Sequence, residues 1–182
     1  MIRTSAMLDR PAPAPAPGNQ RIPPFQSFLE EHRTLVYRFL AATVGPDEAD
    51  DVFQETFLAA LRAYPKLKHA GNLKGWILAI ASRKAIDAAR ARSRRPRPVP
   101  ELPEIADVPG GSPDPLMQGP VWAAVRALPP RQRVALVHRV VLDQPYAELA
   151  AAMGISADAA RADVYQALRK LREGWNDDEE ER

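Results

Sequence analysis

The last third of the chain restricts the fold most, because residues 145–172 have the pattern of two helices joined by a tight turn. Pro145 is tolerated at a helix start, Gly154 suits a left-handed helix end, and Ser156 can cap the following helix. That second helix repeats apolar residues at helical spacing, at Ala160, Val164, Leu168 and Leu171. The pattern predicts a helix-turn-helix, whose second helix can enter the major groove of DNA.

The composition excludes several other classes of protein. The chain has 182 residues and no cysteine, so disulfides, thiolate metal sites and cysteine nucleophiles are excluded. Its three histidines lie far apart without metal-ligand spacing, and we expect neither a metal nor a cofactor. No apolar run approaches the ~18 residues of a membrane helix, and no secretory signal or enzyme motif is found. We therefore expect a cytoplasmic, non-enzymatic protein without membrane insertion.

Charge is distributed unevenly along the chain. The net charge is +2 overall, but residues 1–98 carry +7 and residues 99–182 carry −5. The positive excess is concentrated in one short segment, at Arg90, Arg92, Arg94, Arg95 and Arg97. Such a cluster suits a phosphate backbone, and it is equally typical of a solvated helix end near the negative end of the helix dipole.

Breaks in the apolar pattern predict an all-α protein of two small helical domains. We expect a Pro/Ala-rich disordered tail over residues 1–24, a helical domain over 25–95, a flexible Pro-rich linker over 96–118, a second helical domain over 119–174 and a mobile acidic tail over 175–182. The expected helices are 25–44, a second one capped by Asp47 and ending near Tyr64, 72–95, 121–128, 131–142 and the helix-turn-helix, with Gly174 closing the last.

The third expected helix carries a row of arginines beside an aromatic residue. Helical spacing places Trp76, Arg83, Asp87, Arg90 and Arg94 on one side and turns Leu73, Ile77, Ile80 and Ala81 inward. An aromatic ring near guanidinium groups can stack a base and hold its phosphates, and the basic loop 66–71 just before could receive an unpaired nucleotide. The alternative is that Trp76 is half-buried core and that the arginines only increase solubility. Asp87 lies between Arg83 and Arg90, which suggests a structural ion pair and not an acid–base role.

The second expected helix has an acidic face that continues beyond its first turn. The helix dipole accounts for acidic residues in the first turn, but not for Asp51, Gln54 and Glu55. An acidic face in a basic domain is a candidate docking site for a basic protein partner. A plain solvated face remains the alternative.

Taken together, these residues resemble the sigma-70 family of bacterial transcription initiation factors, in its short extracytoplasmic-function group. The resemblance covers about two-thirds of the chain. It lies in four motifs in a fixed order, which are Asp50 to Phe57, Asn72 to Ala81 with Asp87 and Arg90, Leu128 to Arg133, and Tyr146 to Ser156.

The resemblance implies a role for each segment. Residues matching the part that docks on the coiled coil of the polymerase β′ subunit are Asp51, Gln54, Glu55 and Phe57. Those matching the part that opens and reads the −10 element are Lys66, Lys68, Asn72, Trp76, Arg83, Arg90 and Arg94. Those matching the reader of the −35 element are Ser156, Ala157, Asp158, Arg161 and Tyr165. The implied partners are core RNA polymerase, including its β subunit, promoter DNA and an anti-sigma factor.

Two departures from the family pattern leave other functions open. Arg83 stands where the family usually has Asn, and Asp163 puts an acidic group where a cation is usual. These residues favour a sigma-mimic that binds an anti-sigma factor without activating a promoter. A self-contained helix-turn-helix repressor is the other alternative.

Overall fold

The computed structural model describes residues 21–94 and 119–180, with side chains as far as residue 174. Within these ranges the elements are α1 (Phe25–Val44), α2 (Pro46–Ala63), a 3-10 turn (Tyr64–Lys66), α3 (Leu73–Arg94), α4 (Pro120–Ala127), α5 (Pro130–Val140), α6 (Tyr146–Met153) and α7 (Ala157–Glu180). Every one of these elements is helical and the described residues contain no strand, which confirms the all-α prediction. The expected tail and linker lie outside the described residues.

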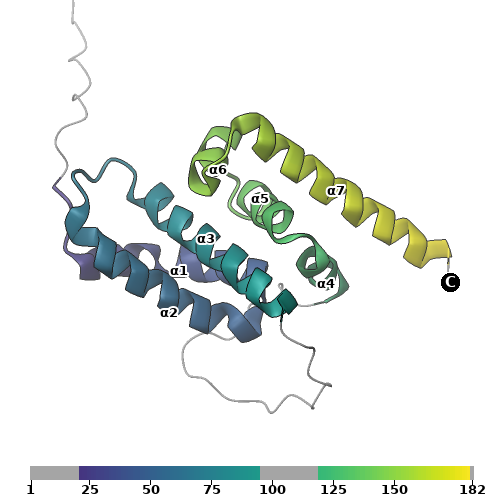
Figure 1. The fold of residues 1–182 in the computed structure, drawn as a ribbon, viewed down its shortest axis with the longest axis horizontal. Helices are drawn as coiled ribbons and strands as arrows, with labels where there is room; N and C mark the ends of the chain where they lie inside the picture. The colour runs from purple at the N-terminus through teal and green to yellow at the C-terminus, as the bar shows by residue number, and fades with distance from the viewer. Residues whose placement is uncertain (1–20, 95–118, 181–182) are drawn as a thin grey trace, which may run out of the picture.

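The N-terminal bundle, α1–α3, begins with an antiparallel pair of helices joined by one residue (Figure 1). Gly45 has a φ of 94°, which a residue with a side chain rarely adopts, and Pro46 then starts α2 with its fixed φ. Gly45 therefore occupies the N-cap, and the prediction that Asp47 caps α2 is wrong. Asp47 lies within the first turn, where the positive end of the helix dipole still stabilises its carboxylate.

The start of α3 is fixed by Asn72. Its side-chain Oδ1 accepts a hydrogen bond of 2.7 Å from the backbone N–H of Gly75, which otherwise has no partner at a helix N-terminus. A Cβ at Gly75 would collide with the Asn72 amide, so the glycine allows the cap to close over it. The same residue that the resemblance assigns to DNA thus also has a local structural task.

The helix-turn-helix forms as predicted. Gly154 ends α6 with a φ of 66°, and the N–H of Ile155 donates to the Ala150 carbonyl at 3.0 Å. Ser156 Oγ accepts a hydrogen bond of 3.1 Å from the N–H of Ala159 and so caps α7. Both Ala150 and Ala160 are buried in the small core that this motif encloses.

Gly174 does not end α7, contrary to the prediction. The helix continues to Glu180, and Gly174 is absent from the described glycines with positive φ. A glycine inside a helix costs ~1 kcal/mol relative to alanine, which is too little to terminate a helix unless the backbone also turns. The backbone of the expected acidic tail is therefore helical as far as residue 180.

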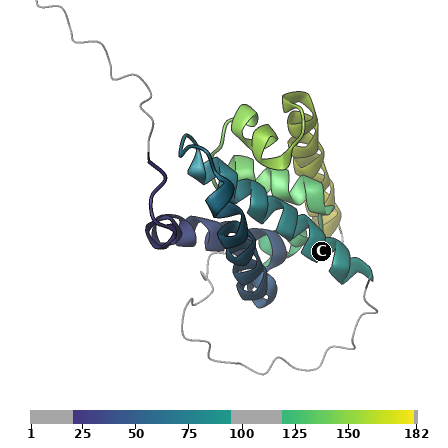
Figure 2. The same ribbon diagram turned by 60° about the vertical axis from the view of Figure 1, so that its left-hand side comes forward.

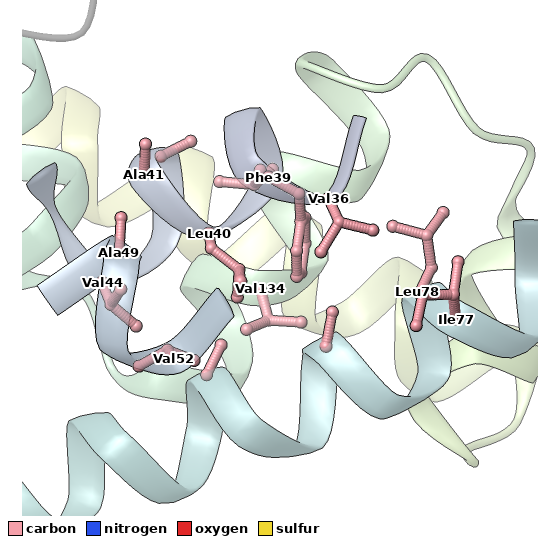
Figure 3. Close-up of a cluster of buried hydrophobic side chains, with 14 of the residues drawn as sticks. Val36, Phe39, Leu40, Ala41, Val44, Ala49, Val52, Ile77, Leu78 and Val134 are labelled. Carbon is pink, nitrogen blue, oxygen red and sulfur yellow. The ribbon is translucent and has the colours of Figure 1, made fainter. Parts of the chain in front are cut away.

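The C-terminal bundle, α4–α7, packs directly on α1 and α3 (Figures 1 and 2). Figure 3 shows Val134 of α5 among Leu40, Val36 and Phe39 of α1. These side chains are all fully or almost fully buried and belong to one cluster with Leu78 of α3. The two bundles therefore share one hydrophobic core, and burying that apolar surface favours the closed arrangement.

Two buried polar contacts also cross between the bundles. Arg133 of α5 donates to the carbonyl of Thr43 at 2.8 Å and to that of Leu128 at 2.9 Å. His138 contacts Ser82 Oγ of α3 through Nε2 at 2.7 Å, and Gln144 Oε1 through Nδ1 at 2.6 Å. Because buried polar groups without partners are costly, these contacts also select one relative orientation of the bundles.

Candidate nucleic-acid and polymerase interfaces

One exposed stripe runs along α2. Asp51, Gln54 and Glu55 are solvent-exposed, and Glu55 forms an ion pair of 2.9 Å with Lys84 of α3. The stripe continues with Leu58 and Leu61, which are 52% and 49% exposed and follow at helical spacing. The sequence indicates these two leucines only as apolar residues of the second expected helix and predicts no surface role for them, although their offset from Gln54 could have found it. The α2 stripe therefore combines acidic and apolar groups, which suits a protein partner.

Phe57 does not belong to the α2 stripe. Its side chain is buried, and its ring lies 4.7 Å from that of Phe53 and 6.4 Å from that of Phe28. Phe57 therefore supports α2 from inside the bundle, and any effect it has on a partner would act through the position of the helix.

A cleft of 540 Å³ lies beside the loop that precedes α3. Its walls come from residues 70–74, from Arg21 and Pro23, and from Glu31 and His32 of α1. Burial lowers the pKa of His32, an effect that Lys74 adds to and Glu31 opposes. Lys66 and Lys68 are exposed on the same connection, and Asn72 lies at the rim. The cleft offers positive charge and polar groups at the place where the sequence predicts that a nucleotide binds.

Trp76 lies mostly in the core and not beside the arginine row. Its ring is 5.6 Å from that of Phe28 and 5.9 Å from that of Tyr64. The Trp76 side chain is partly buried against the core, which agrees with the alternative that Trp76 is half-buried core.

The arginines of α3 are exposed, and part of their row faces the C-terminal bundle. Arg83, Asp87 and Arg90 line a cleft of 210 Å³ together with Arg131, Met153 and Ile155. The predicted ion pair of Asp87 is not found, since in the described ranges neither Arg83 nor Arg90 lies within 4 Å of its carboxylate. Arg94 is exposed at the end of α3.

A second buried side of α3 was not predicted. Ile77 and Ala81 point inward as expected, while Leu73 and Ile80 are only partly buried. The residues missed are Leu78, Ser82 and Ala85, which are also buried. Ser82 contacts His138 of the C-terminal bundle, and Leu78 and Ala85 belong to the shared core. A pattern with two apolar sides has little amphipathic signal.

The start of α7 presents a polar surface. Ser156, Asp158 and Arg161 are exposed, Ala157 is partly exposed, and Tyr165 is 68% exposed. Arg161 pairs with Asp158 at 2.8 Å across one turn. A mixture of small, hydroxyl and guanidinium groups at the start of the second helix of a helix-turn-helix is suited to base edges and phosphates.

Asp163 does not point into this surface. Its side chain is only 17% exposed, and its carboxylate pairs with Arg131 of α5 at 3.2 Å. Next to this pair, Gln132 donates to Gln166 Oε1 at 2.7 Å. The acidic departure from the family pattern is therefore used in packing α7 on α5, and it places little negative charge in front of DNA.

The part of the chain that the structure describes offers no metal site and no membrane-spanning helix. In residues 21–94 and 119–174 no group of three or more acidic or histidine side chains is placed to hold a metal ion. Among the helices that the structure describes, none has the length and apolarity needed to cross a membrane.

The fold thus defines a helical protein in which a helix-turn-helix bundle packs on a second bundle with its own basic helix. The family described as Sigma-70 region 2 matches residues 28–95, and that described as Sigma-70, region 4 matches residues 118–171. The chain belongs to the sigma-70 family, and its relatives place it in the extracytoplasmic-function group.

Two relatives from Mycobacterium tuberculosis illustrate this placement. The chain is 34% identical over 166 residues to the ECF RNA polymerase sigma factor SigD, an alignment that covers 80% of this chain and 74% of SigD. It is 30% identical over 167 residues to the ECF sigma factor SigC, with 86% and 84% covered.

Solved structures show the same fold at lower identity. The sigma factor RpoE from Bartonella quintana, solved in complex with the anti-sigma factor NepR, has a TM-score of 0.61 at 22% identity, covering 82% of this chain and 94% of RpoE. CnrH, solved in complex with the cytosolic domain of CnrY, has a TM-score of 0.57 at 20% identity, covering 85% and 88%.

Proposed function

We propose that this protein is an alternative sigma factor that binds core RNA polymerase and directs promoter recognition, DNA melting and transcription initiation. The observation that carries the proposal is the match of both sigma regions on one chain, each folded into its own bundle. The protein itself performs no catalysis in this proposal, since the polymerase makes the transcript.

The α2 stripe is the proposed docking site for the coiled coil of the polymerase β′ subunit. Exposed acidic groups at Asp51 and Glu55 would steer a basic partner, and exposed leucines would supply apolar contact area. Gln54 lies between them and can donate and accept hydrogen bonds. The buried Phe57 holds the helix in place.

Loop 66–72 and the basic side of α3 are the proposed site for the melted −10 element. Extruding a base costs a few kcal/mol of lost stacking, which contacts to the displaced strand must offset. The cleft beside Asn72 is large enough for a nucleotide-sized group, and Lys66 and Lys68 are placed to hold phosphates. Trp76 would add a partly exposed ring, and Arg83, Arg90 and Arg94 would follow the backbone.

The −10 site is tested by Arg90→Ala combined with Arg94→Ala. Both side chains are exposed, so the variant should fold and keep its affinity for core polymerase while losing open-complex formation. Permanganate footprinting of unpaired thymines measures that step. Normal melting by the double variant would contradict the assignment of α3. Trp76→Ala is a less clear test because it removes a core aromatic side chain.

The start of α7 is the proposed reader of the −35 element in the major groove. The start of a second helix is the part that reaches base edges. The residues at and near the start of α7 are its cap Ser156 and Ala157, Asp158, Arg161 and Tyr165. The pairing of Asp163 with Arg131 supports this function over a sigma-mimic. Because the Asp163 carboxylate is used in packing on α5, it is no longer an argument for the mimic, and only Arg83 remains as one.

The closed arrangement must open before both elements are bound. Positions −10 and −35 are about 25 base pairs apart, or ~85 Å along B-form DNA, whereas the two proposed DNA surfaces belong to bundles in direct contact. The 24 residues between the described bundles can span at most ~80 Å when fully extended. Together with the dimensions of the two bundles, this length is enough to reach both promoter elements. Because RpoE was solved in complex with an anti-sigma factor, we include an anti-sigma factor among the proposed partners.

Run-off transcription with purified core polymerase tests the proposal. A sigma factor gives promoter-dependent transcripts, whose starts can be mapped by sequencing. A sigma-mimic would give no such product, and a stand-alone repressor would bind duplex DNA tightly without polymerase. Either result would overturn the proposed function.

A further inference from the structure

A cleft of 210 Å³ lies between the two bundles and takes its walls from both. The residues that α3 contributes are Arg83, Asp87 and Arg90, and the C-terminal bundle contributes Arg131 of α5 together with Met153 and Ile155 beside the turn from α6 to α7. Figure 1 shows α3 alongside α5 and α6, which agrees with the contacts between these helices. Because its two walls belong to different bundles, the complete cleft exists only while the protein is closed.

The lining of this cleft carries more positive than negative charge. Three guanidinium groups and one carboxylate, that of Asp87, give it a net charge of +2. In residues 21–94 and 119–174, no carboxylate lies within 4 Å of the guanidinium of Arg83 or Arg90. Arg131 does have a partner, Asp163 at 3.2 Å, yet its side chain is still 48% exposed. The positive charge of the cleft is therefore only partly neutralised by the protein itself.

The arginines of the cleft also have hydrogen-bond donors to offer. A guanidinium group has five N–H groups in a planar fork. Arg83 uses one of them on the Ala79 carbonyl at 3.3 Å, and Arg131 uses its Nη2 on Asp163. Arg131 also lies in the first turn of α5, which contains no acidic residue to balance the positive end of the helix dipole. Both features favour a small anion with several acceptor oxygens.

Size and geometry narrow the class of anion. The cleft is smaller than the ~300–1,000 Å³ sites that hold drug-sized molecules, which favours a small ion. Guanidinium groups pair with phosphate through parallel N–H···O hydrogen bonds, and a phosphate group carries about −1.5 to −2 charges at pH 7. That charge is close in magnitude and opposite in sign to the charge of the lining. The partly buried apolar side chains of Met153 and Ile155 also reduce screening by water.

We propose that this cleft binds a phosphate-class anion between Arg83, Arg90 and Arg131, and that the bound anion stabilises the closed form. Opening would carry Arg131 away from α3, so the open protein retains only part of the site. A ligand shifts a conformational equilibrium by the difference between its affinities for the two states, so the anion favours closure. One consequence rests on the proposed function: the anion occupies two arginines of the −10 site and therefore opposes promoter binding.

Phosphate binding to the full chain, measured by equilibrium dialysis at constant ionic strength, tests the site without polymerase or DNA. Arg131→Gln should weaken binding about 10-fold, because it removes a charge-assisted pair of hydrogen bonds. Asp87→Asn should tighten binding several-fold, because it removes the one carboxylate of the lining. Arg169→Gln is the matched control for a cation outside the cleft, since Arg169 is also about half-exposed and pairs with Glu173 at 3.4 Å.

A further variant separates the charge of Arg131 from its contribution to packing. Asp163→Asn breaks the same ion pair but keeps the guanidinium, so phosphate should bind at least as tightly as it does to the wild type. Phosphate should also raise the urea midpoint of the wild type more than that of Arg131→Gln, because bound ligand adds stability beyond the general salt effect that the two proteins share. Equal rises in the two midpoints would overturn the link to closure.

Inorganic phosphate and adenosine monophosphate, used as separate probes, distinguish two sources of the phosphate group. Equal or weaker binding of the nucleotide identifies the free ion as the ligand, and tighter binding identifies the phosphate of a larger molecule. The inference is overturned if neither probe binds saturably, or if Arg169→Gln or Asp163→Asn weakens binding as much as Arg131→Gln does. Each of these results leaves the proposed function standing, since run-off transcription tests that function separately.

Discussion

The two helices proposed to read DNA differ in how much of each is available in the closed protein. α3 is covered by α1 and α2 on one side and by α5 and α6 on another, and Arg83 and Arg90 line the cleft between the bundles. α7 contacts mainly its own bundle, and its first turns are exposed. The closed form therefore partly covers the basic face of the −10 helix and leaves the start of the −35 helix open.

Separating the bundles would therefore uncover more of the −10 surface than of the −35 surface. The core between the bundles includes Val134 of α5, and the polar contacts between the bundles involve Ser82 of α3 and Thr43 of α1. Separating the bundles would therefore expose apolar and polar groups of both. Breaking the contact between the bundles should raise the exposure of the −10 surface more than that of the −35 surface.

The largest effect is expected from Val134→Asp. Val134 is 1% exposed at the centre of the interdomain core, and an unpaired carboxylate there costs several kcal/mol. The closed form should be lost, with a lower midpoint in urea unfolding and faster proteolysis between the bundles. Val121→Asp, at a 49% exposed position of α4, is the control. Equal stability of the two variants would show that the bundles do not depend on this contact.

A second prediction sharpens the comparison at the polymerase face. Leu58→Asp combined with Leu61→Asp should reduce affinity for core polymerase more than ~10-fold, because it removes the apolar contact area of the α2 stripe and would desolvate two carboxylates in the interface. Stability should change little, since neither residue is buried. A pull-down titration with core polymerase measures the effect, and unchanged binding would remove the α2 stripe from the docking site.

The third prediction concerns pH. Burial lowers the pKa of His138 to about 4 from 6.5, although its hydrogen bond with Gln144 raises it. Between these values the unfolded state binds a proton that the folded state does not, so stability falls as the pH drops from 6.5 towards 4. At pH 4 the free energy of unfolding is lower than at neutral pH by ~3 kcal/mol.

His138→Gln should flatten this part of the stability curve. Urea unfolding between pH 7 and pH 4 measures the slope, and His69→Gln, which changes an exposed loop histidine, should keep the wild-type slope. If His138→Gln keeps the wild-type slope as well, the imidazole is not the group that couples the interdomain contact to pH.

The smallest effect is expected from Asp163→Asn. The substitution removes an ion pair with the half-exposed Arg131, which is worth at most ~1 kcal/mol. Selective binding to a duplex that carries the −35 element should be kept, because the carboxylate faces α5. A gel shift with holoenzyme measures it, and a large gain in affinity would show instead that Asp163 repels DNA phosphates.

Local signals were enough to predict much of the fold from the sequence. The break at Gly45-Pro46, the bounds of α1, the turn at Gly154 and the cap at Ser156 depend on residues near one another in the chain. The exposed positions of Asp51, Glu55, Arg90 and Arg161 follow from helical spacing alone.

The remaining features depend on tertiary contacts that spacing does not contain. Trp76 and Phe57 lie at helical positions that fit a surface or a core, and only the aromatic cluster around Phe28 decides between them. The burial of Ser82 and His138, the pairing of Asp163 and the cleft between Arg131 and α3 all join segments distant in sequence. Their positions therefore could not be predicted from the sequence.

The distance between the bundles tests the central claim most directly. The chain has no cysteine, so Arg33→Cys in α1 and Lys170→Cys in α7, both exposed, allow specific labelling with a donor and an acceptor dye. We predict high energy transfer in the free protein and low transfer in the complex with core polymerase and promoter. Transfer that is equally high in both states would contradict the claim that promoter binding opens the protein.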